Sequence, residues 1–242
     1  MQTLNRHKEE IIQNGFTVIN EIFTGTEVEN IIKLIEEANV SNPGISKSTG
    51  IFAIRRFFKE IPEALELIFN DRLMTVIQQF FGSGYGVVKS IYFNKPEQSN
   101  WFVAYHQDLT ISVNKKAAVE GYTKWTVKQD QFAVQPPLHI LENNFTIRIH
   151  LDNTDENNGA LKVIAGSYLK GICRPETIDL VIEKEIFCVV KKGGIMVMKP
   201  LLLHASNKTL NQHQRRVIHI EFSNAKLPTE INWAENFPLR SF

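Results

Sequence analysis

Hydrophobic positions follow a helical spacing in the first third of the chain. Residues 5–14 are predicted to form a helix that Gly15 ends, and Phe16–Ile19 reads as a strand. A capping box at Thr24 and Glu27, or at Thr26 and Glu29, precedes a second helix. A third helix is predicted over 61–81, because its apolar residues recur every three or four positions until three glycines follow, at 82, 84 and 86.

A two-residue alternation replaces the helical spacing after residue 86. It predicts strands over 87–93, 102–112, 145–151, 160–164, 186–190, 195–198 and 215–222, separated by loops rich in Asn, Asp, Gly and Pro. Between two of these strands, residues 113–144 form a long and weakly patterned insertion that includes Trp125. Insertions of this length are often lids over a binding site, so we expect a lid here.

Two strands place a polar face opposite an apolar face. In 145–152, Thr146, Arg148, His150 and Asp152 alternate with apolar residues, and in 215–222 Val217, His219 and Glu221 alternate with Ile218, Ile220 and Phe222. A polar face is costly to bury unless it has partners. Such faces are expected around a ligand cavity inside a barrel.

Composition narrows the class of protein. The 242 residues are 43% hydrophobic, enough for one large domain, and the net charge of +1 argues against a nucleic-acid-binding protein. The two cysteines, Cys173 and Cys188, predict a reducing compartment without a disulfide framework. With neither a signal peptide nor an apolar run long enough to span a bilayer in the sequence, we expect a cytoplasmic protein without membrane partners.

A metal site is predicted at His106-Gln107-Asp108. Residues i and i+2 of a strand point to the same face, so an imidazole and a carboxylate would project side by side. Together with one distant histidine they would form the 2-His-1-carboxylate triad of non-heme Fe(II). His204 is a candidate for that third ligand, and Arg215 follows it by eleven residues.

A rival motif has the same spacing. His150-Leu151-Asp152 is also His-x-Asp on a predicted strand, and either motif could join His204. The first leaves 95 residues between Asp108 and His204, and the second leaves 51 after Asp152, so each allows further strands in between. Spacing alone does not choose between them.

Four segments together resemble the phytanoyl-CoA dioxygenase family. They read NKP at 94–96, YHQDL at 105–109, NGALKVIAGSY at 158–168 and KPLLLHAS at 199–206, and the likeness extends from the Gly15-Phe16 strand to about Phe222. The resemblance implies a mainly β fold with flanking helices: a double-stranded β-helix, jelly-roll or cupin-like, with N-terminal helices packed outside the barrel. It implies one domain over 1–242, with helical support at 1–86, the barrel at 87–222, the lid at 113–144 and a tail at 223–242.

The resemblance also implies roles for single residues. His106, Asp108 and His204 match the metal ligands, which makes them the expected catalytic centre, and Arg215 and Ser206 match residues that bind the distal carboxylate of 2-oxoglutarate. Ile91 matches a position that lines the co-substrate site, and Arg55 resembles an arginine that precedes the barrel in bacterial members. Arg148 stands where some relatives have a tryptophan beside 2-oxoglutarate. A second departure is Ala165 and Tyr168, where the family often has Pro and His.

Several residues carry two interpretations. Arg215 shares the polar face of its strand and Arg216 the packing face, which favours Arg215 as the carboxylate clamp. Arg148 either contacts a ligand or pairs with Glu221 or Asp152. Trp125 either contacts substrate beneath the lid or belongs to the core, and it is taken with Gln107 as a candidate substrate contact.

The expected function is that of an Fe(II)- and 2-oxoglutarate-dependent dioxygenase. It would use O2 to hydroxylate a small organic molecule at an unactivated C–H bond, with release of succinate and CO2; desaturation and ring formation are other outcomes of this chemistry. Two other classes remain: a zinc hydrolase, which would not need Arg215 in the cavity, and a non-catalytic cupin-like binding protein. Lysines 115, 116, 124 and 128 either bind a CoA phosphate or form a solvated face. The protein is expected to be a monomer or a small homo-oligomer.

Overall fold

The computed structural model describes residues 2–41, 52–95, 102–128, 130–174, 176, 178–179 and 181–239. The helices precede most of the strands in the chain. They are α1 (Gln2–Asn14), α2 (Gly25–Ser41), α3 (Phe57–Glu60), α4 (Ala64–Ile68), α5 (Asp71–Phe81) and α6 (Leu138–Asn143), with short 3-10 helices at η1 (Glu156–Asn158) and η2 (Ser167–Lys170). The strands are β1 (Phe16–Ile19), β2 (Phe52–Arg55), β3 (Gly86–Lys95), β4 (Val103–His106), β5 (Ile111–Val113), β6 (Thr123–Lys128), β7 (Gln131–Gln135), β8 (Phe145–His150), β9 (Leu161–Ile164), β10 (Glu185–Phe187), β11 (Ile195–Met198), β12 (His204–Ser206), β13 (Arg215–Ser223) and β14 (Phe237–Pro238).

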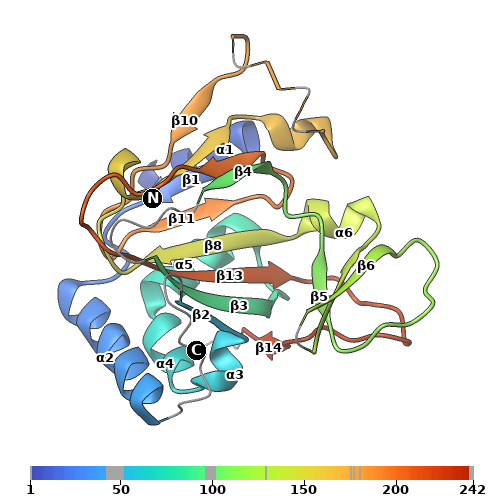
Figure 1. Ribbon diagram of the computed structural model, residues 1–242, viewed down its shortest axis with the longest axis horizontal. Helices are drawn as coiled ribbons and strands as arrows, with labels where there is room; N and C mark the ends of the chain where they lie inside the picture. The colour runs from blue at the N-terminus through green and yellow to red at the C-terminus, as the bar shows by residue number, and fades with distance from the viewer. Residues whose placement is uncertain are drawn as a thin grey trace.

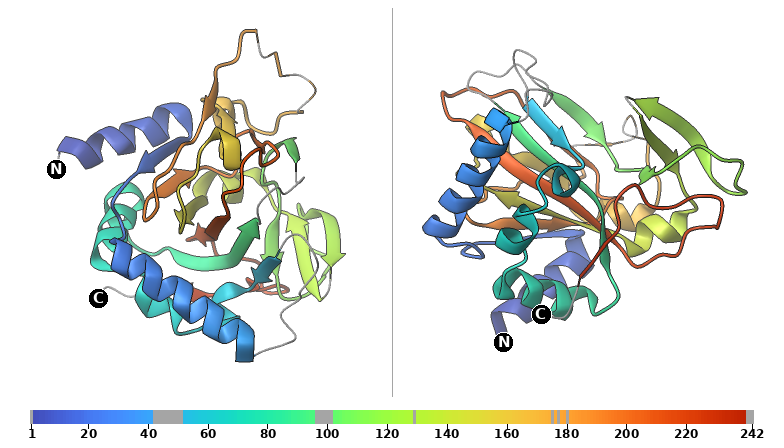
Figure 2. Two further views of the ribbon diagram at one scale, coloured as in Figure 1. Left: turned by 60° about the vertical axis from the view of Figure 1, so that its left-hand side comes forward. Right: turned by 90° about the horizontal axis from the view of Figure 1, so that it is seen from below.

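The strands form three antiparallel sheets. The large sheet has the order β1-β11-β8-β13-β3-β14, with β2 also pairing with β3. A second sheet has the order β10-β9-β12-β4, and a third has the order β5-β7-β6 (Figure 1). The first two sheets make up the double-stranded β-helix that the sequence predicted, and the third projects to one side of it (Figure 2). The expected fold class is therefore confirmed.

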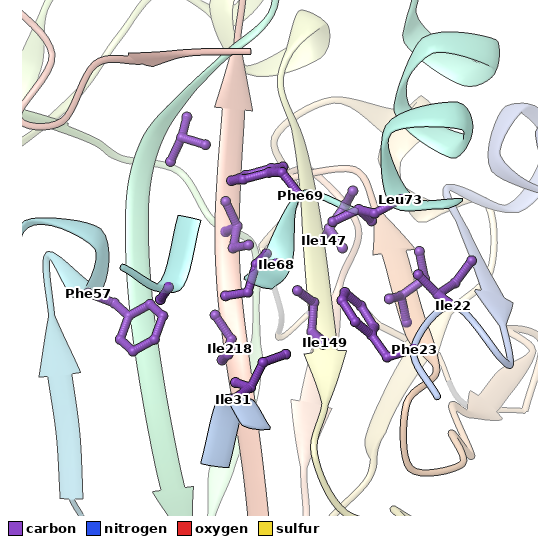
Figure 3. Close-up of a cluster of buried hydrophobic side chains, with 14 of the residues drawn as sticks. Ile22, Phe23, Ile31, Phe57, Ile68, Phe69, Leu73, Ile147, Ile149 and Ile218 are labelled. Atoms are coloured by element: carbon purple, nitrogen blue, oxygen red, sulfur yellow. The ribbon is translucent and has the colours of Figure 1, made fainter. Parts of the chain in front are cut away.

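Helices α1 to α5 pack on the outer face of the large sheet, whereas α6 packs with the third sheet. Phe145, Ile147 and Ile149 of β8 point to this face and are fully buried. They belong to one hydrophobic cluster with residues of the helices, such as Ile31 of α2 and Leu73 of α5 (Figure 3). Burial of each such side chain contributes about 1.5–3 kcal/mol. This cluster fixes the large sheet and leaves its inner face free for polar side chains.

The first helices follow the prediction, but the third does not. Thr24 and Glu27 form the reciprocal capping box at the start of α2: the Thr24 amide donates to Glu27 Oε2 (2.7 Å) and the Glu27 amide donates to Thr24 Oγ1 (3.2 Å). The single helix predicted over 61–81 is wrong, because α4 ends at Ile68 and α5 begins at Asp71. Asn70 separates them: its backbone is extended and its side chain accepts from the Leu73 amide (2.9 Å), which makes it the N-cap of α5.

The strand predicted over 102–112 is also wrong. It divides into β4 and β5, which belong to different sheets. The insertion 113–144 is not irregular either, since it carries β6, β7 and α6, and β7 lies between β5 and β6. The strands predicted over 16–19 and 195–198 have the predicted ends, and the remaining predicted strands are present with shifted ends. β2, β12 and β14 were not predicted.

Candidate active site

A cavity of about 280 Å³ lies between the large sheet and the second sheet. Its walls come from β2, β3, β8 and β13 on one side and from β4, β9 and β12 on the other. The lining residues are Arg55, Lys89, Ile91, Phe93, Lys95, Val103, His106, Asp108, Arg148, Leu161, His204, Ser206, Arg215 and His219. Most of the polar residues singled out in the sequence therefore meet in one place.

His106, Asp108 and His204 come together in this cavity. β4 and β12 run antiparallel with His106 directly opposite His204, and the two ring centroids are 4.2 Å apart. Asp108 follows β4, and its Oδ2 lies 3.9 Å from His204 Nε2. One potential ligand atom from each residue lies within 4.8 Å of the others. The spacing suits three ligands on one face of a metal ion.

The backbone orients both imidazoles for metal binding. His106 Nδ1 donates to the Ala104 carbonyl and His204 Nδ1 donates to the Leu202 carbonyl, each at 2.9 Å. These bonds place the proton on Nδ1 and leave the Nε2 lone pair free. Asp108 Oδ2 is buried without a hydrogen-bond partner in the described part of the chain. Two free imidazole nitrogens and one unpartnered carboxylate oxygen are the donors that Fe(II) takes in this class of site.

The protonation states also suit a metal. Burial alone would raise the pKa of Asp108, but His204, His219 and Lys89 outweigh it and lower that pKa to about 2. Burial lowers the pKa of His204 to about 4, against the opposing effect of Asp108. At neutral pH the carboxylate is therefore ionised and this imidazole is neutral, the forms that bind metals.

Arg215 presents a buried guanidinium to the same cavity. Its Nε and Nη1 are buried and have no hydrogen-bond partner among the residues that the structure describes. Burial and the nearby Arg148 lower the pKa of Arg215 to about 9. Ser206, the second residue after His204 on β12, is buried and lines the cavity as well. An unpartnered guanidinium beside a hydroxyl fits a carboxylate ligand.

Lys95 adds a second cation at this end of the cavity. It pairs in register with Arg215, and its Nζ donates to the Asn207 carbonyl (2.9 Å). Gly159 makes room for this ammonium: its φ is +82°, and a Cβ there would lie 2.6 Å from Lys95 Nζ. Burial and Arg215 lower the pKa of Lys95 to about 8.

A polar network crosses the inner face of the large sheet. Arg148 Nη1 donates to His219 Nδ1 (3.1 Å), so His219 carries its proton on Nε2 and donates it to Glu221 Oε1 (3.1 Å). Lys89 Nζ donates to the same Glu221 oxygen (2.5 Å). Glu221 thus forms an ion pair with Lys89, whereas Arg148 forms a hydrogen bond with the neutral imidazole of His219. The sequence had offered Glu221 or Asp152 as the partner of Arg148, and neither is.

The rival motif has other surroundings. His150 is buried, and its Nδ1 bonds Thr154 Oγ1 (2.8 Å). Asp152 accepts two bonds from the Arg216 guanidinium, from Nε (2.9 Å) and from Nη2 (2.8 Å). Neither residue lines the cavity. Arg216 lies on the face opposite Arg215, as the alternation along β13 predicted.

Two of the predicted substrate residues lie elsewhere. Gln107 uses its side chain to join distant backbone: Nε2 donates to the carbonyls of Gly171 (2.8 Å) and Leu201 (2.6 Å), and Oε1 accepts from the Cys173 amide (2.8 Å). Trp125 packs against a hydrophobic cluster around Ile111, Val113 and Tyr122. The structure therefore favours the core interpretation for Trp125.

Ile91 and Arg55 line the cavity and face each other across β3 and β2. Six further lining residues were not proposed from the sequence as site residues: Val103, Leu161, His219, Lys89, Phe93 and Lys95. The last three lie on β3. The signal for them was present, because 89, 91, 93 and 95 alternate along one strand and so share one face.

In the described ranges, none of the helices is both long and apolar enough to cross a membrane.

Comparisons with known proteins show the family and the fold. The family model of Phytanoyl-CoA dioxygenase (PhyH) matches residues 11–217. No curated protein matches the chain at a significant level. Solved structures share the fold: the non-heme alpha-ketoglutarate-dependent carbocyclase SnoK from nogalamycin biosynthesis has a TM-score of 0.67 at 14% identity, over 90% of this chain and 83% of SnoK. EctD from S. alaskensis, solved with 2-oxoglutarate and 5-hydroxyectoine, has a TM-score of 0.67 at 18% identity, over 90% of this chain and 75% of EctD. The epimerase SnoN from nogalamycin biosynthesis has a TM-score of 0.65 at 12% identity, over 99% of this chain and 96% of SnoN.

Proposed function

The chain belongs to the phytanoyl-CoA dioxygenase family and is an oxygenase of the iron- and 2-oxoglutarate-dependent type, and we propose that it hydroxylates a small organic molecule at an unactivated C–H bond. Succinate and CO2 are the co-products of the proposed reaction. We further propose that residues 1–242 form one catalytic domain, because the helices before residue 86 share a hydrophobic cluster with the large sheet.

One observation carries the proposal. Three side chains with potential ligand atoms face one cavity, and the same cavity holds a buried guanidinium that has no partner among the residues the structure describes. His106, Asp108 and His204 would hold Fe(II), and Arg215 with Ser206 would hold the distal carboxylate of 2-oxoglutarate. The residues that would bind iron and the residues that would bind 2-oxoglutarate line the same cavity, which supports the proposal.

Bound iron and 2-oxoglutarate supply the oxidising chemistry of this enzyme class, in which decarboxylation to succinate accompanies activation of O2. The protein positions the reactants. The carbonyls of Ala104 and Leu202 fix the two imidazole rings, and the amide of Asp108 donates to the Pro200 carbonyl (2.9 Å), which fixes the carboxylate at the end of β4. Arg215 would orient the co-substrate by a charge-assisted contact with its distal carboxylate. The apolar walls at Ile91, Phe93 and Leu161 keep water from part of the cavity.

The zinc-hydrolase alternative leaves Arg215 without a role. A hydrolase needs only the metal and its bound water, whereas burying an unpaired guanidinium costs free energy that a bound carboxylate would recover. The binding-protein alternative leaves unexplained why two histidines and an aspartate each keep one metal-binding atom without a hydrogen bond to the described part of the chain. SnoK is a carbocyclase and SnoN an epimerase, so the fold also supports outcomes other than hydroxylation.

Conversion of 2-oxoglutarate to succinate tests the proposal. Purified protein with Fe(II), O2 and 2-oxoglutarate should form succinate, and omission of iron should abolish it. His204→Ala should reduce succinate formation by at least 100-fold, with the fold checked by circular dichroism. Hydrolysis supported by Zn(II) without 2-oxoglutarate would instead favour the hydrolase. Metal binding without any turnover, and without metal-dependent binding of 2-oxoglutarate, would favour the binding protein.

A further inference from the structure

We propose that the substrate of this oxygenase is a small anion, a carboxylate or a phosphate monoester, and that its negative group binds Arg148 and Arg55. The inference rests on the proposed function, since it assigns the second ligand of the same cavity. It uses the charges that remain after iron and 2-oxoglutarate have been placed.

The cavity is rich in positive charge. Among the lining residues that the structure describes, Arg55, Lys89, Lys95, Arg148 and Arg215 are basic and Asp108 alone is acidic. Lys89 is neutralised by Glu221 just behind the wall. Asp108 would be taken by the metal. The remaining cations divide into two groups, Arg215 with Lys95 and Arg148 with Arg55.

The strand register separates these two groups. Arg215 pairs with Lys95 at one end of β13 and β3. Arg148, His219, Ile91 and Arg55 form one row across β8, β13, β3 and β2, because each is the register partner of the next. The backbone of this row is about 14 Å long, and the side chains of Arg148 and Arg55 at its two ends both reach the same cavity. Positions 215 and 219 are four residues apart, about 13 Å along a strand. The guanidinium of Arg148 still lies near enough to lower the pKa of Arg215, so a carboxylate held by Arg215 offsets part of this charge, and the row keeps an excess of positive charge.

Arg148 and Arg55 have no acidic partner. Within the described ranges, neither guanidinium forms an ion pair with a carboxylate. Arg148 is buried, its Nη1 contacts the neutral His219, and its Nε has no partner. A buried cation without a counter-ion is costly, so the site is built to receive an anion at this row. His219 fixes the Arg148 head, because Glu221 in turn holds the imidazole through Nε2.

The size of the cavity limits the substrate. Its volume of about 280 Å³ is at the low end of small-molecule sites, which span about 300–1,000 Å³, and 2-oxoglutarate must occupy part of it. A complete CoA thioester is larger than the remaining space, so only its acyl part could enter the cavity. A compact molecule with one carboxylate or phosphate fits.

Matched pairs of anions and neutral isosteres test the proposal. The probes are benzoate with benzamide, hexanoate with hexanamide, and phenyl phosphate with phenol. Binding is measured by ligand-observed NMR to protein held without oxygen and saturated with Zn(II) and 2-oxoglutarate, so that the co-substrate site is filled. At least one anion should bind 10-fold more tightly than its neutral partner.

Variants then locate the anion. Arg148→Gln and Arg55→Gln should each weaken anion binding by at least 10-fold, while 2-oxoglutarate binding changes by less than threefold. Arg148→Lys keeps the charge and should restore most of the anion binding, which separates loss of charge from loss of fold. Arg56→Gln is the matched control, because Arg56 neighbours Arg55 but donates to the Asp130 carbonyl (2.8 Å) and does not line the cavity.

Two results would overturn the inference. Equal binding of anions and neutral partners, or no anion binding at all, would remove the charge requirement. Loss of 2-oxoglutarate binding in Arg148→Gln, with anion binding intact, would assign Arg148 to the co-substrate. Both leave the proposed function standing, which would fail on a different result: wild-type protein that does not bind 2-oxoglutarate in the presence of metal.

Discussion

Two His-x-Asp sequences end strands in this chain, and the structure gives them opposite surroundings. His106 is the last residue of β4 and Asp108 lies two positions after it, and both side chains reach the cavity between the sheets. His150 and Asp152 occur at the end of β8, where His150 is buried against Thr154 and Asp152 turns outward to Arg216. The two motifs have the same residue types and the same spacing, so neither property decides which one is a metal site.

The strand that pairs with each motif decides which of the two can form a metal site. His106 lies opposite His204 in the antiparallel pair of β4 and β12, which supplies a third ligand without a further loop. His150 lies opposite Val217 of β13, which offers no ligand atom. The backbone adds a second difference, since carbonyls two residues upstream fix His106 and His204, whereas a hydroxyl two residues after Asp152 fixes His150. A metal site of this kind is thus a property of two paired strands.

The largest expected difference between the two motifs is in the loss of turnover when their residues are substituted. Alanine at His106, Asp108 or His204 should reduce iron-dependent succinate formation by at least 100-fold, because each removes one of three ligands. His150→Ala and Asp152→Ala should keep turnover within about 10-fold wherever they remain folded. Succinate formation and Fe(II) affinity measure both sets. Iron affinity lost in His150→Ala but kept in His106→Ala would reverse the assignment.

Adjacent arginines on β13 extend the comparison. Arg215→Ala should weaken 2-oxoglutarate binding about 10- to 100-fold, since a charge-assisted bond to a buried carboxylate contributes about 1.5–3 kcal/mol. Arg216→Ala should change that binding by less than threefold, because its guanidinium lies on the outer face with Asp152. Titration of metal-loaded protein with 2-oxoglutarate compares the two. The opposite ranking would mean that the inner face of β13 has been misassigned.

The outer ion pair of the second motif should show its effect in stability. Asp152→Asn removes one charge of a largely buried pair with Arg216 and should lower the free energy of unfolding by about 1–3 kcal/mol. Glu9→Gln, on the exposed side of α1, is a control of the same chemical kind and should change it by less than about 0.5 kcal/mol. Urea denaturation measures both. Equal stability of the two variants would show that the ion pair contributes nothing.

Local patterns in the sequence predicted local features. The alternation along 145–152 and 215–222 placed Arg148 and His219 on the inner face and Arg216 on the outer face, since a period of two is a property of each strand alone. The capping box at Thr24 and Glu27 was predicted for the same reason. Each of these depends on residues only a few positions apart.

Features that depend on distant residues were missed. The break between β4 and β5 follows Gln107, whose side chain bonds Gly171, Leu201 and Cys173, at least 64 positions away. The environment of Trp125 depends on β5 and β7, which pair across the insertion. The choice between the two His-x-Asp motifs depended on the register of β12, a strand that the alternation did not reveal. The family resemblance pointed to His106 because it compares residues across the whole chain.

The smallest expected difference concerns the response of the second motif to pH. Burial, with Arg148 and Arg215 nearby, holds the pKa of His150 well below its usual value of 6.5. Below about pH 6.5 the unfolded chain therefore binds a proton at this residue, while the folded protein does not. Because protonation favours the unfolded chain, the contribution of this residue to the free energy of unfolding is highest near pH 7 and declines as the pH falls. From pH 7 to pH 5.5 this single group should cost about 1 kcal/mol. In His150→Gln, which keeps a polar group beside Thr154, the decline measured by urea denaturation of metal-free protein should be smaller by that amount.

His139→Gln, at an exposed position on α6, serves as the control. A decline as steep in His150→Gln as in the wild type would show that His150 is protonated in the folded protein, and would remove the contrast between its buried neutral ring and the cavity-facing ring of His106.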